Sequence, residues 1–285
     1  MKEYMKLIRI KHYTNNLLIF LPIIFSRNLL EVDLLTNVIF GFVLFCLTAS
    51  IVYIFNDIKD IESDKLHPQK CKRPIASGKI TKKQAIFIII ILAIVTMEIA
   101  LTKFANNLEI ICILLIYVGI NIAYTIKLKK IPIVDIFILA MGFLIRVIFG
   151  ATLISVQVSN WLYLTILSIS FYMGMGKRRN EMIKVSDNEE TREVLKYYNK
   201  NFLNENMYMF LALAIVFYSL WCVDMSNKFQ YIMYTIPLIM FLAMQYSLAI
   251  EKGTHGDPVE VILENKKLVI GILISIVLII VLIYV

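Results

Sequence analysis

Apolar residues occur in long runs along this chain, and short polar segments separate the runs. A run of about 18 to 24 residues is the length that a helix needs to cross roughly 30 Å of hydrocarbon. The pattern predicts nine such spans, of which the first is the shortest because Asn15, Asn16 and Pro22 interrupt it. The expected spans lie near 13–30, 34–56, 84–103, 108–126, 132–154, 160–176, 206–224, 229–250 and 267–285. We therefore expect an all-α polytopic membrane protein, with residues 1–285 forming a single transmembrane domain.

Composition and charge also indicate a membrane protein, and they do not indicate a nucleic-acid partner. Hydrophobic residues make up 59% of the 285 residues, against about 45–50% in soluble domains. Most of the 29 Lys and Arg residues fall in alternate polar segments, namely 2–11, 57–83, 127–130, 177–200 and 252–267. The positive-inside rule assigns these segments to the cytoplasm. We expect a plasma-membrane protein with a cytoplasmic N-terminus and an external C-terminus, whose net charge of +8 reflects topology and not nucleic-acid binding.

The segment NDIKDIESD, which ends the second expected span, contains the clearest candidate chemistry. On a helix Asp57, Asp60 and Asp64 would lie on one face, since they are spaced i, i+3 and i+7. Mg²⁺ is commonly held by one or two carboxylates together with phosphate oxygens of a substrate. We therefore predict a magnesium site for a diphosphate at the membrane surface, with Asp57 and Asp60 as the main ligands and Asp64 as a third. The alternative is a solvated helix end with ordinary acidic residues.

The polar segment that follows contains basic residues in the pattern KLHPQKCKRPIASGKI. Lys70 and Arg73 can donate hydrogen bonds to phosphate oxygens, Arg73 as a planar fork. Pro74 stiffens the segment and Gly78 permits a tight turn. The segment thus favours binding of an anion together with its bound metal ion. Basic segments of this kind also contact lipid headgroups, which is the alternative.

A second long polar segment begins with MGMGKRRNEM. If the sixth span continues as a helix, Lys177 and Arg178 come close to Glu181, at i, i+4 and i, i+3. We predict that Lys177, Arg178 and Glu181 belong to a phosphate-binding site on the same side of the membrane as the acidic segment. A surface helix with ion pairs is the alternative.

Two charged residues lie inside the fifth expected span, where a charge costs on the order of 2.5–3.5 kcal/mol at the span centre. Asp135 and Arg146 are eleven residues apart, so both lie on one helical face. We expect both side chains to face the interior of the bundle. Contact with substrate and pairing with polar groups of other helices remain alternatives for them.

These motifs resemble the UbiA superfamily of intramembrane prenyltransferases. The family signature N-D-x-x-D-x-x-x-D is matched at four positions, and its R-P-x-x-x-G at three: Asn56, Asp57, Asp60, Asp64, Arg73, Pro74 and Gly78. The resemblance implies nine helices around a lateral cavity that is open to lipid and capped by cytosolic loops.

The second motif indicates a branch of that family. Members that ionise a prenyl diphosphate commonly have another aspartate-rich motif after the sixth helix, whereas this chain has KRRNE there, and Asp187, Glu189 and Glu190 follow only later. The chain is more similar to the decaprenyl-phosphate phosphoribosyltransferases, which have K-R-x-x-E at this position. Segments around Asn16, from Tyr124 to Ala151, and HGDPVEVILENKKL fit the same branch.

The resemblance implies Mg²⁺-dependent transfer of 5-phosphoribose from phosphoribosyl diphosphate (PRPP) to a polyprenyl phosphate, in cell-wall precursor biosynthesis. The implied catalytic residues are Asp57, Asp60, Lys177 and Glu181. The implied substrate-binding residues are Asn16, Asn56, Lys70, Arg73, Tyr124, Asp135, Arg146 and Arg178. A UbiA-type enzyme that transfers a prenyl group from prenyl diphosphate to an aromatic or polyol acceptor is the main alternative, and a transporter or lipid-binding scaffold is another. The sequence indicates neither an oligomeric state nor a polyprenyl chain length.

Overall fold

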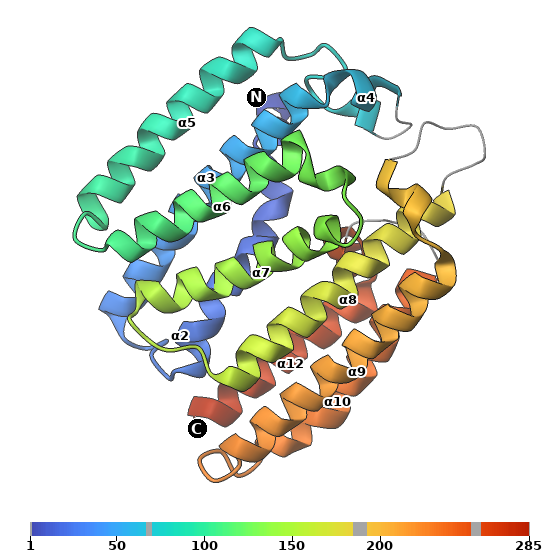
Figure 1. Cartoon of the computed structure of the whole chain (residues 1–285). Helices are drawn as coiled ribbons and strands as arrows, with labels where there is room; N and C mark the ends of the chain where they lie inside the picture. The colour runs from blue at the N-terminus through green and yellow to red at the C-terminus, as the bar shows by residue number, and fades with distance from the viewer. Residues whose placement is uncertain (1, 67–69, 185–192, 252–257, 285) are drawn as a thin grey trace. The chain divides into compact units, whose positions relative to one another are not determined.

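A computed structural model describes residues 2–66, 70–184, 193–251 and 258–284, and all regular elements in these ranges are helices (Figure 1). The α-helices are α1 (Lys2–Leu7), α2 (Leu21–Phe25), α3 (Val32–Lys59), α4 (Ile61–Leu66), α5 (Lys82–Lys103), α6 (Leu108–Ile126), α7 (Val134–Leu153), α8 (Asn160–Lys184), α9 (Lys200–Met225), α10 (Ile236–Glu251), α11 (Pro258–Glu264) and α12 (Lys266–Tyr284). The 3₁₀ helices are η1 (Ile10–Phe20), η2 (Lys70–Lys72), η3 (Leu128–Lys130), η4 (Glu193–Tyr197) and η5 (Ile232–Thr235). The expected all-α class is confirmed.

Seven helical segments in the described ranges are long and apolar enough to cross a membrane. They are α3, α5, α6, α7, α9, η5 with α10, and α12, and they correspond to seven of the nine expected spans. The segment expected at 13–30 is instead the eleven-residue η1 followed by the five-residue α2. The sixth expected span lies in α8, whose 25 residues include the polar KRRNE segment. The count of nine spans stays a prediction.

The chain divides into two compact units. The first contains residues 1–23, 29–138 and 145–156, and the second contains 24–28, 139–144 and 157–285. In the first unit α3 packs against α5, α6 and η1. The most apolar part of α3 is 56% buried, whereas that of α5 is only 6% buried. Thus α3 forms the centre of this unit, and α5 leaves most of its apolar side chains exposed.

The 3₁₀ helix η1 is held against α7 by close packing and by a buried polar contact. A Cβ atom at Gly150 would overlap the carbonyl oxygen of Ile19, so only glycine permits this approach. Asn16 accepts a hydrogen bond of 2.7 Å from Nε of Arg146, and both residues are buried. Irregular backbone is tolerated at membrane depth where it packs against protein, and these two contacts pack one side of η1 against α7.

In the second unit α8 packs along α9, and α10 packs against both α9 and α12. A buried cluster of Trp221, Cys222, Phe229, Ile232 and Ile283 joins α9, η5 and α12.

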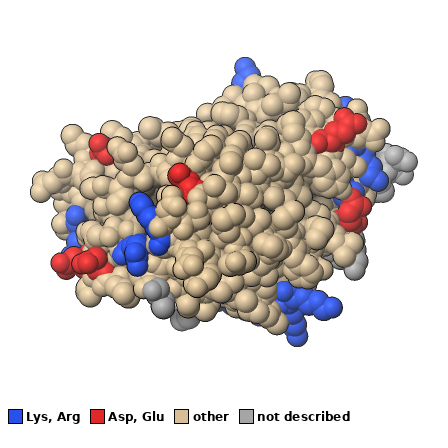
Figure 2. Space-filling model, turned by 90° about the horizontal axis from the view of Figure 1, so that it is seen from below, with Lys and Arg blue, Asp and Glu red and all other residues tan. Residues whose placement is uncertain are grey.

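Many of the exposed side chains are apolar. Figure 2 shows a face that is mostly uncharged, with its charged side chains in a few separate groups. An uncharged surface of this kind suits contact with lipid tails.

Candidate active site

The acidic segment lies where α3 ends and α4 begins. α3 ends at Lys59, Asp60 follows it with φ −97° and ψ 13°, and α4 then begins at Ile61. Asp57 and Asp64 are both 3% exposed, while the side chain of Asp60 is 20% exposed. The break at Asp60 therefore separates this carboxylate from the other two, which are buried.

Three basic side chains from distant parts of the sequence pair with these carboxylates. Nη1 of Arg73 lies 3.0 Å from Oδ1 of Asp57 and 2.6 Å from Oδ2 of Asp64. Nη2 of Arg9 lies 2.5 Å from the same Oδ1 of Asp57. Nζ of Lys129, in η3, lies 2.5 Å from Oδ1 of Asp60. Asp57 and Asp64 thus share Nη1 of Arg73, whereas Asp60 pairs separately with Lys129.

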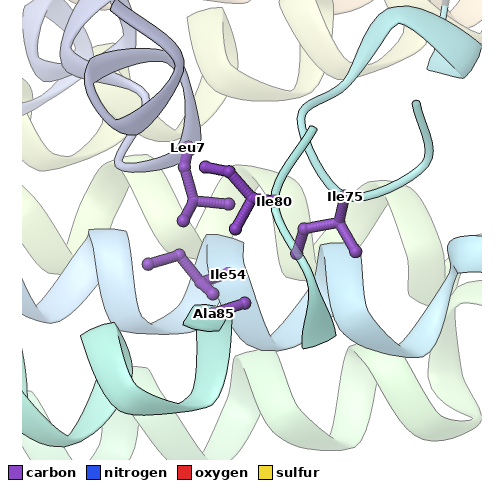
Figure 3. Close-up of a cluster of buried hydrophobic side chains, with 5 residues drawn as sticks. All are labelled: Leu7, Ile54, Ile75, Ile80 and Ala85. Carbon is purple, nitrogen blue, oxygen red and sulfur yellow. The ribbon is translucent and has the colours of Figure 1, made fainter. Parts of the chain in front are cut away.

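An apolar cluster holds the segments that carry Arg9 and Arg73 beside the end of α3. Its members are Leu7, Ile54, Ile75, Ile80 and Ala85, and Figure 3 shows their side chains converging. Leu7 is the last residue of α1, Ile54 is one turn before Asp57 on α3, and Ile75 is two residues after Arg73. Burial of this cluster fixes both arginines beside Asp57. Each buried Leu or Ile side chain contributes about 1.5–3 kcal/mol.

The backbone at both arginines is shaped for this contact. The amide of Ser77 donates to the Arg73 carbonyl at 2.9 Å, and Gly78 closes the turn with φ +74°, a conformation that glycine adopts without steric cost. Arg9 has φ 55° and ψ 48°, in the left-handed region that non-glycine residues rarely adopt. Its guanidinium lies 4.9 Å from the centre of the Tyr53 ring.

Other residues expected at the site lie close to this segment. Oγ1 of Thr125 donates a 3.1 Å hydrogen bond to Oδ1 of Asn56, which ties α6 to the end of α3. Tyr124 precedes Thr125 and is half-buried, and Lys70 lies near enough to Asp64 to favour its charged form. Burial nevertheless raises the pKa of Asp64 above its ordinary value, while Arg73 acts in the opposite direction and Asp57 adds to the rise.

Asp135 and Arg146 are both buried, as expected. The guanidinium of Arg146 donates to Asn16 and to the Tyr117 hydroxyl at 3.3 Å, and it lies 5.0 Å from the Phe45 ring centre. These contacts bind η1, α6 and α7 together. A structural role is therefore visible for Arg146 and Asn16, and their contact with substrate stays a prediction, as it does for Asp135.

The KRRNE segment lies in the second unit, within α8, so the expected helical continuation is confirmed. Nη1 of Arg178 lies 2.6 Å from Oε2 of Glu181, at the predicted i, i+3 spacing. Arg178 is fully buried, Lys177 is half-buried, and the side chain of Glu181 is 23% exposed. Asp187, Glu189 and Glu190 lie outside the described residues.

The family follows from a comparison of the whole chain with known proteins. Residues 17–257 match the model of the UbiA prenyltransferase family. The chain belongs to this family. The resemblance inferred from the two motifs is thereby confirmed, and the protein is an integral membrane transferase of the UbiA family.

Two curated relatives are named decaprenyl-phosphate phosphoribosyltransferase. The Mycolicibacterium smegmatis protein is 29% identical over 248 residues, which cover 83% of this chain and 77% of the relative. The Corynebacterium glutamicum protein is 29% identical over 238 residues, which cover 81% and 71%. Among solved structures, a UbiA homolog from Archaeoglobus fulgidus bound to GPP and Mg²⁺ has a TM-score of 0.71 at 16% identity and covers 99% of this chain and 100% of its own. This likeness confirms the fold.

The UbiA fold raises the question of whether these carboxylates suit a magnesium ion. Within the described ranges, no group of three or more His, Cys, Asp or Glu side chains is placed to hold a metal ion. Mg²⁺, however, needs only one or two carboxylates when substrate phosphates and water supply the rest. Asp57 and Asp64 meet this need because their oxygens already share one cationic group. The donor set therefore fits Mg²⁺ that arrives with a diphosphate.

Two residues at this UbiA site could not be identified from the sequence. Arg9 lies 48 positions before Asp57, and Lys129 lies 69 positions after Asp60. In the sequence both belong to basic segments that the positive-inside rule already explains. The feature that could have singled out Arg9 is its backbone conformation, which is visible only in the structure.

Proposed function

We propose that this chain transfers 5-phosphoribose from PRPP to a polyprenyl phosphate and releases diphosphate. The bond between C1 of the ribose and the diphosphate oxygen breaks, and its electron pair leaves with the diphosphate. An oxygen of the lipid phosphate forms the new bond to C1, with inversion expected at that carbon. The lipid phosphate is already anionic, so the reaction requires no strong general base.

One observation carries this proposal: the chain has one acidic cluster and one basic cluster where many family members have two acidic ones. Lys177 and the buried Arg178 occupy the position of the second acidic motif. A ribose 5-phosphate or a lipid phosphate would be stabilised by such cations, and a second magnesium ion would not. The names of the two curated relatives support the same assignment.

The acidic cluster provides the leaving-group site in this proposal. Mg²⁺ held by Asp57 and Asp64, with Asp60 beside them, would stabilise negative charge that develops on the departing diphosphate. Arg73, whose Nη1 now contacts both carboxylates, would donate to diphosphate oxygens once Mg²⁺ takes its place between them. Lys70 would add a further positive charge. Catalysis would then depend on positioning and on electrostatic stabilisation.

The basic cluster would hold a phosphate group of the donor or acceptor. Glu181 keeps the Arg178 guanidinium oriented through their 2.6 Å contact. Lys177 precedes them on the same helix and would contact the phosphate as a point charge. We also keep the topology predicted from the sequence: nine spans in one domain, a cytoplasmic N-terminus, an external C-terminus, and both motifs on the cytosolic side.

A donor screen tests the proposal. Purified protein in Mg²⁺-containing buffer would be incubated with decaprenyl phosphate and PRPP labelled on the ribose, and in parallel with labelled geranyl diphosphate and an aromatic or polyol acceptor. We expect label in the lipid fraction only with PRPP, and none when EDTA replaces Mg²⁺. The Archaeoglobus fulgidus structure contains GPP, so the prenyl-transfer alternative has a specific precedent. A product formed only from the prenyl diphosphate would establish that alternative and overturn our proposal.

A further inference from the structure

We propose that Arg179 is a phosphate-binding residue, in addition to the residues assigned above, and that its Nη1 group donates to a phosphate oxygen of the substrate. This inference rests on the proposed function and extends its second site. Arg179 is absent from the residues that the sequence motif singles out.

The guanidinium of Arg179 is buried and held on two of its three nitrogens. Nε donates to Oδ1 of Asn204 on α9 at 2.6 Å, and Nη2 donates to Oε1 of Glu251 on α10 at 2.6 Å. The Tyr208 hydroxyl donates to the same Oε1 at 3.3 Å and steadies the carboxylate. Three helices of the second unit thus fix the plane and the direction of the guanidinium.

The third nitrogen, Nη1, is buried and has no hydrogen-bond partner within the described part of the chain. The Arg179 side chain is only 2% exposed, so water outside the protein does not reach this group freely. A buried donor on a charged group costs more than about 1–3 kcal/mol when it is unsatisfied. Groups of this kind are rare in native proteins and call for a specific explanation.

An anionic oxygen is the partner that suits this donor. A guanidinium that is already fixed loses little entropy when it binds a phosphate, and its remaining arm offers a charge-assisted hydrogen bond. Arg178, the preceding residue, is also fully buried. Two consecutive buried arginines are expensive to maintain for packing alone, since burial of an ion pair is often no better than burial of apolar side chains of similar volume. The geometry is that of a preorganised phosphate site.

The phosphate could belong to PRPP or to the polyprenyl phosphate, and a binding experiment can distinguish them. Full-length protein in phosphatidylcholine nanodiscs with Mg²⁺ would be titrated separately with PRPP, decaprenyl phosphate and geranyl diphosphate. Arg179→Lys keeps the charge but cannot reach Asn204, Glu251 and a ligand together. We expect it to weaken binding of one phosphate ligand by about 10- to 100-fold, as loss of one hydrogen bond to a charged group predicts.

Glu251→Gln is the matched control, because it breaks the same ion pair but keeps the guanidinium. It should lower the melting temperature about as much as Arg179→Lys and change ligand affinity less than about threefold, within the effect of one neutral hydrogen bond. Asn204→Asp gives a second variant, which adds a carboxylate beside Nε without removing Arg179. It should preserve folding and weaken the same ligand by repulsion.

Two results would overturn the inference. One is equal affinity for every phosphate ligand in wild type and Arg179→Lys. The other is a loss of affinity in Glu251→Gln as large as that in Arg179→Lys, which would show that only the clamp between helices matters. If wild type binds geranyl diphosphate and not PRPP, the proposed function fails, but the Arg179 inference is still decided by the variants with the ligand that binds.

Discussion

Replacement of Arg73 by Gln tests whether this guanidinium holds the two buried carboxylates of the acidic segment. After the change Asp57 keeps its contact with Arg9, whereas Asp64 loses its ion-pair partner within the described chain. Removal of one partner of a buried pair costs about 3–5 kcal/mol. The Arg73 side chain is 25% exposed, so we expect a loss near the lower end, about 3 kcal/mol.

The reciprocal substitution, Asp64→Asn, should cost much less. Burial raises the pKa of Asp64 above its ordinary value of 3.8, despite Arg73. The folded protein therefore binds this proton more tightly than the unfolded chain does. Stability from this group is complete below pH 3.8 and falls as pH rises through the folded pKa. Asn lacks this penalty, so we expect Asp64→Asn to cost less than about 1 kcal/mol at pH 7.

A double-mutant cycle measures the interaction directly. Unfolding of wild type, the Arg73→Gln and Asp64→Asn variants and the double variant would be followed by circular dichroism during titration with SDS in mixed micelles. We expect a coupling energy of about 2 kcal/mol, with the double variant more stable than Arg73→Gln alone. A coupling below about 0.5 kcal/mol, or equal destabilisation by the two single variants, would refute the reasoning.

Three other substitutions test separate parts of the structure. Gly150→Ala should destabilise the protein by about 1–3 kcal/mol, because the new methyl group meets the backbone of η1; Gly119→Ala on α6, where a Cβ meets no atom within 4 Å, is the control and should be neutral or slightly stabilising. Asn16→Leu should lower stability by about 1–3 kcal/mol, since Nε of Arg146 loses its acceptor, and a melting temperature equal to that of wild type would contradict this. Asp57→Asn should abolish turnover while the far-ultraviolet circular dichroism spectrum is kept, and retained turnover would remove this carboxylate from the active site.

The sequence was sufficient for the features that repeat or that lie close together along the chain. Hydrophobic runs predicted the α-class and seven helices, and the i, i+3 spacing predicted the contact between Arg178 and Glu181. It did not predict the interruption of the helix at Asp60, where α3 ends and α4 begins. A continuous helix would place the three acids on one face, whereas the structure pairs Asp57 with Asp64 through Arg73.

The parts that the sequence could not predict are contacts between distant segments. Glu251 lies 72 residues after Arg179, and nothing in the apolar pattern of α10 indicates that its last residue accepts a buried arginine. The winding of the first expected span is another feature that the apolar pattern does not predict. The helical period of 3.6 residues does not describe a 3₁₀ helix, which has three residues per turn.

Because η1 is a 3₁₀ helix, it is longer than an α-helix with the same number of residues. A 3₁₀ helix rises about 2.0 Å per residue and an α-helix about 1.5 Å. The eleven residues of η1 and the five of α2 therefore have a combined axial length of about 30 Å, whereas the same residues wound as one α-helix would measure about 24 Å. The summed length of the two helices is close to the hydrocarbon thickness of a bilayer, and a first span at 13–30 stays a prediction. The 3₁₀ winding thus lengthens this segment, and the close approach of Gly150 to Ile19 holds η1 against α7.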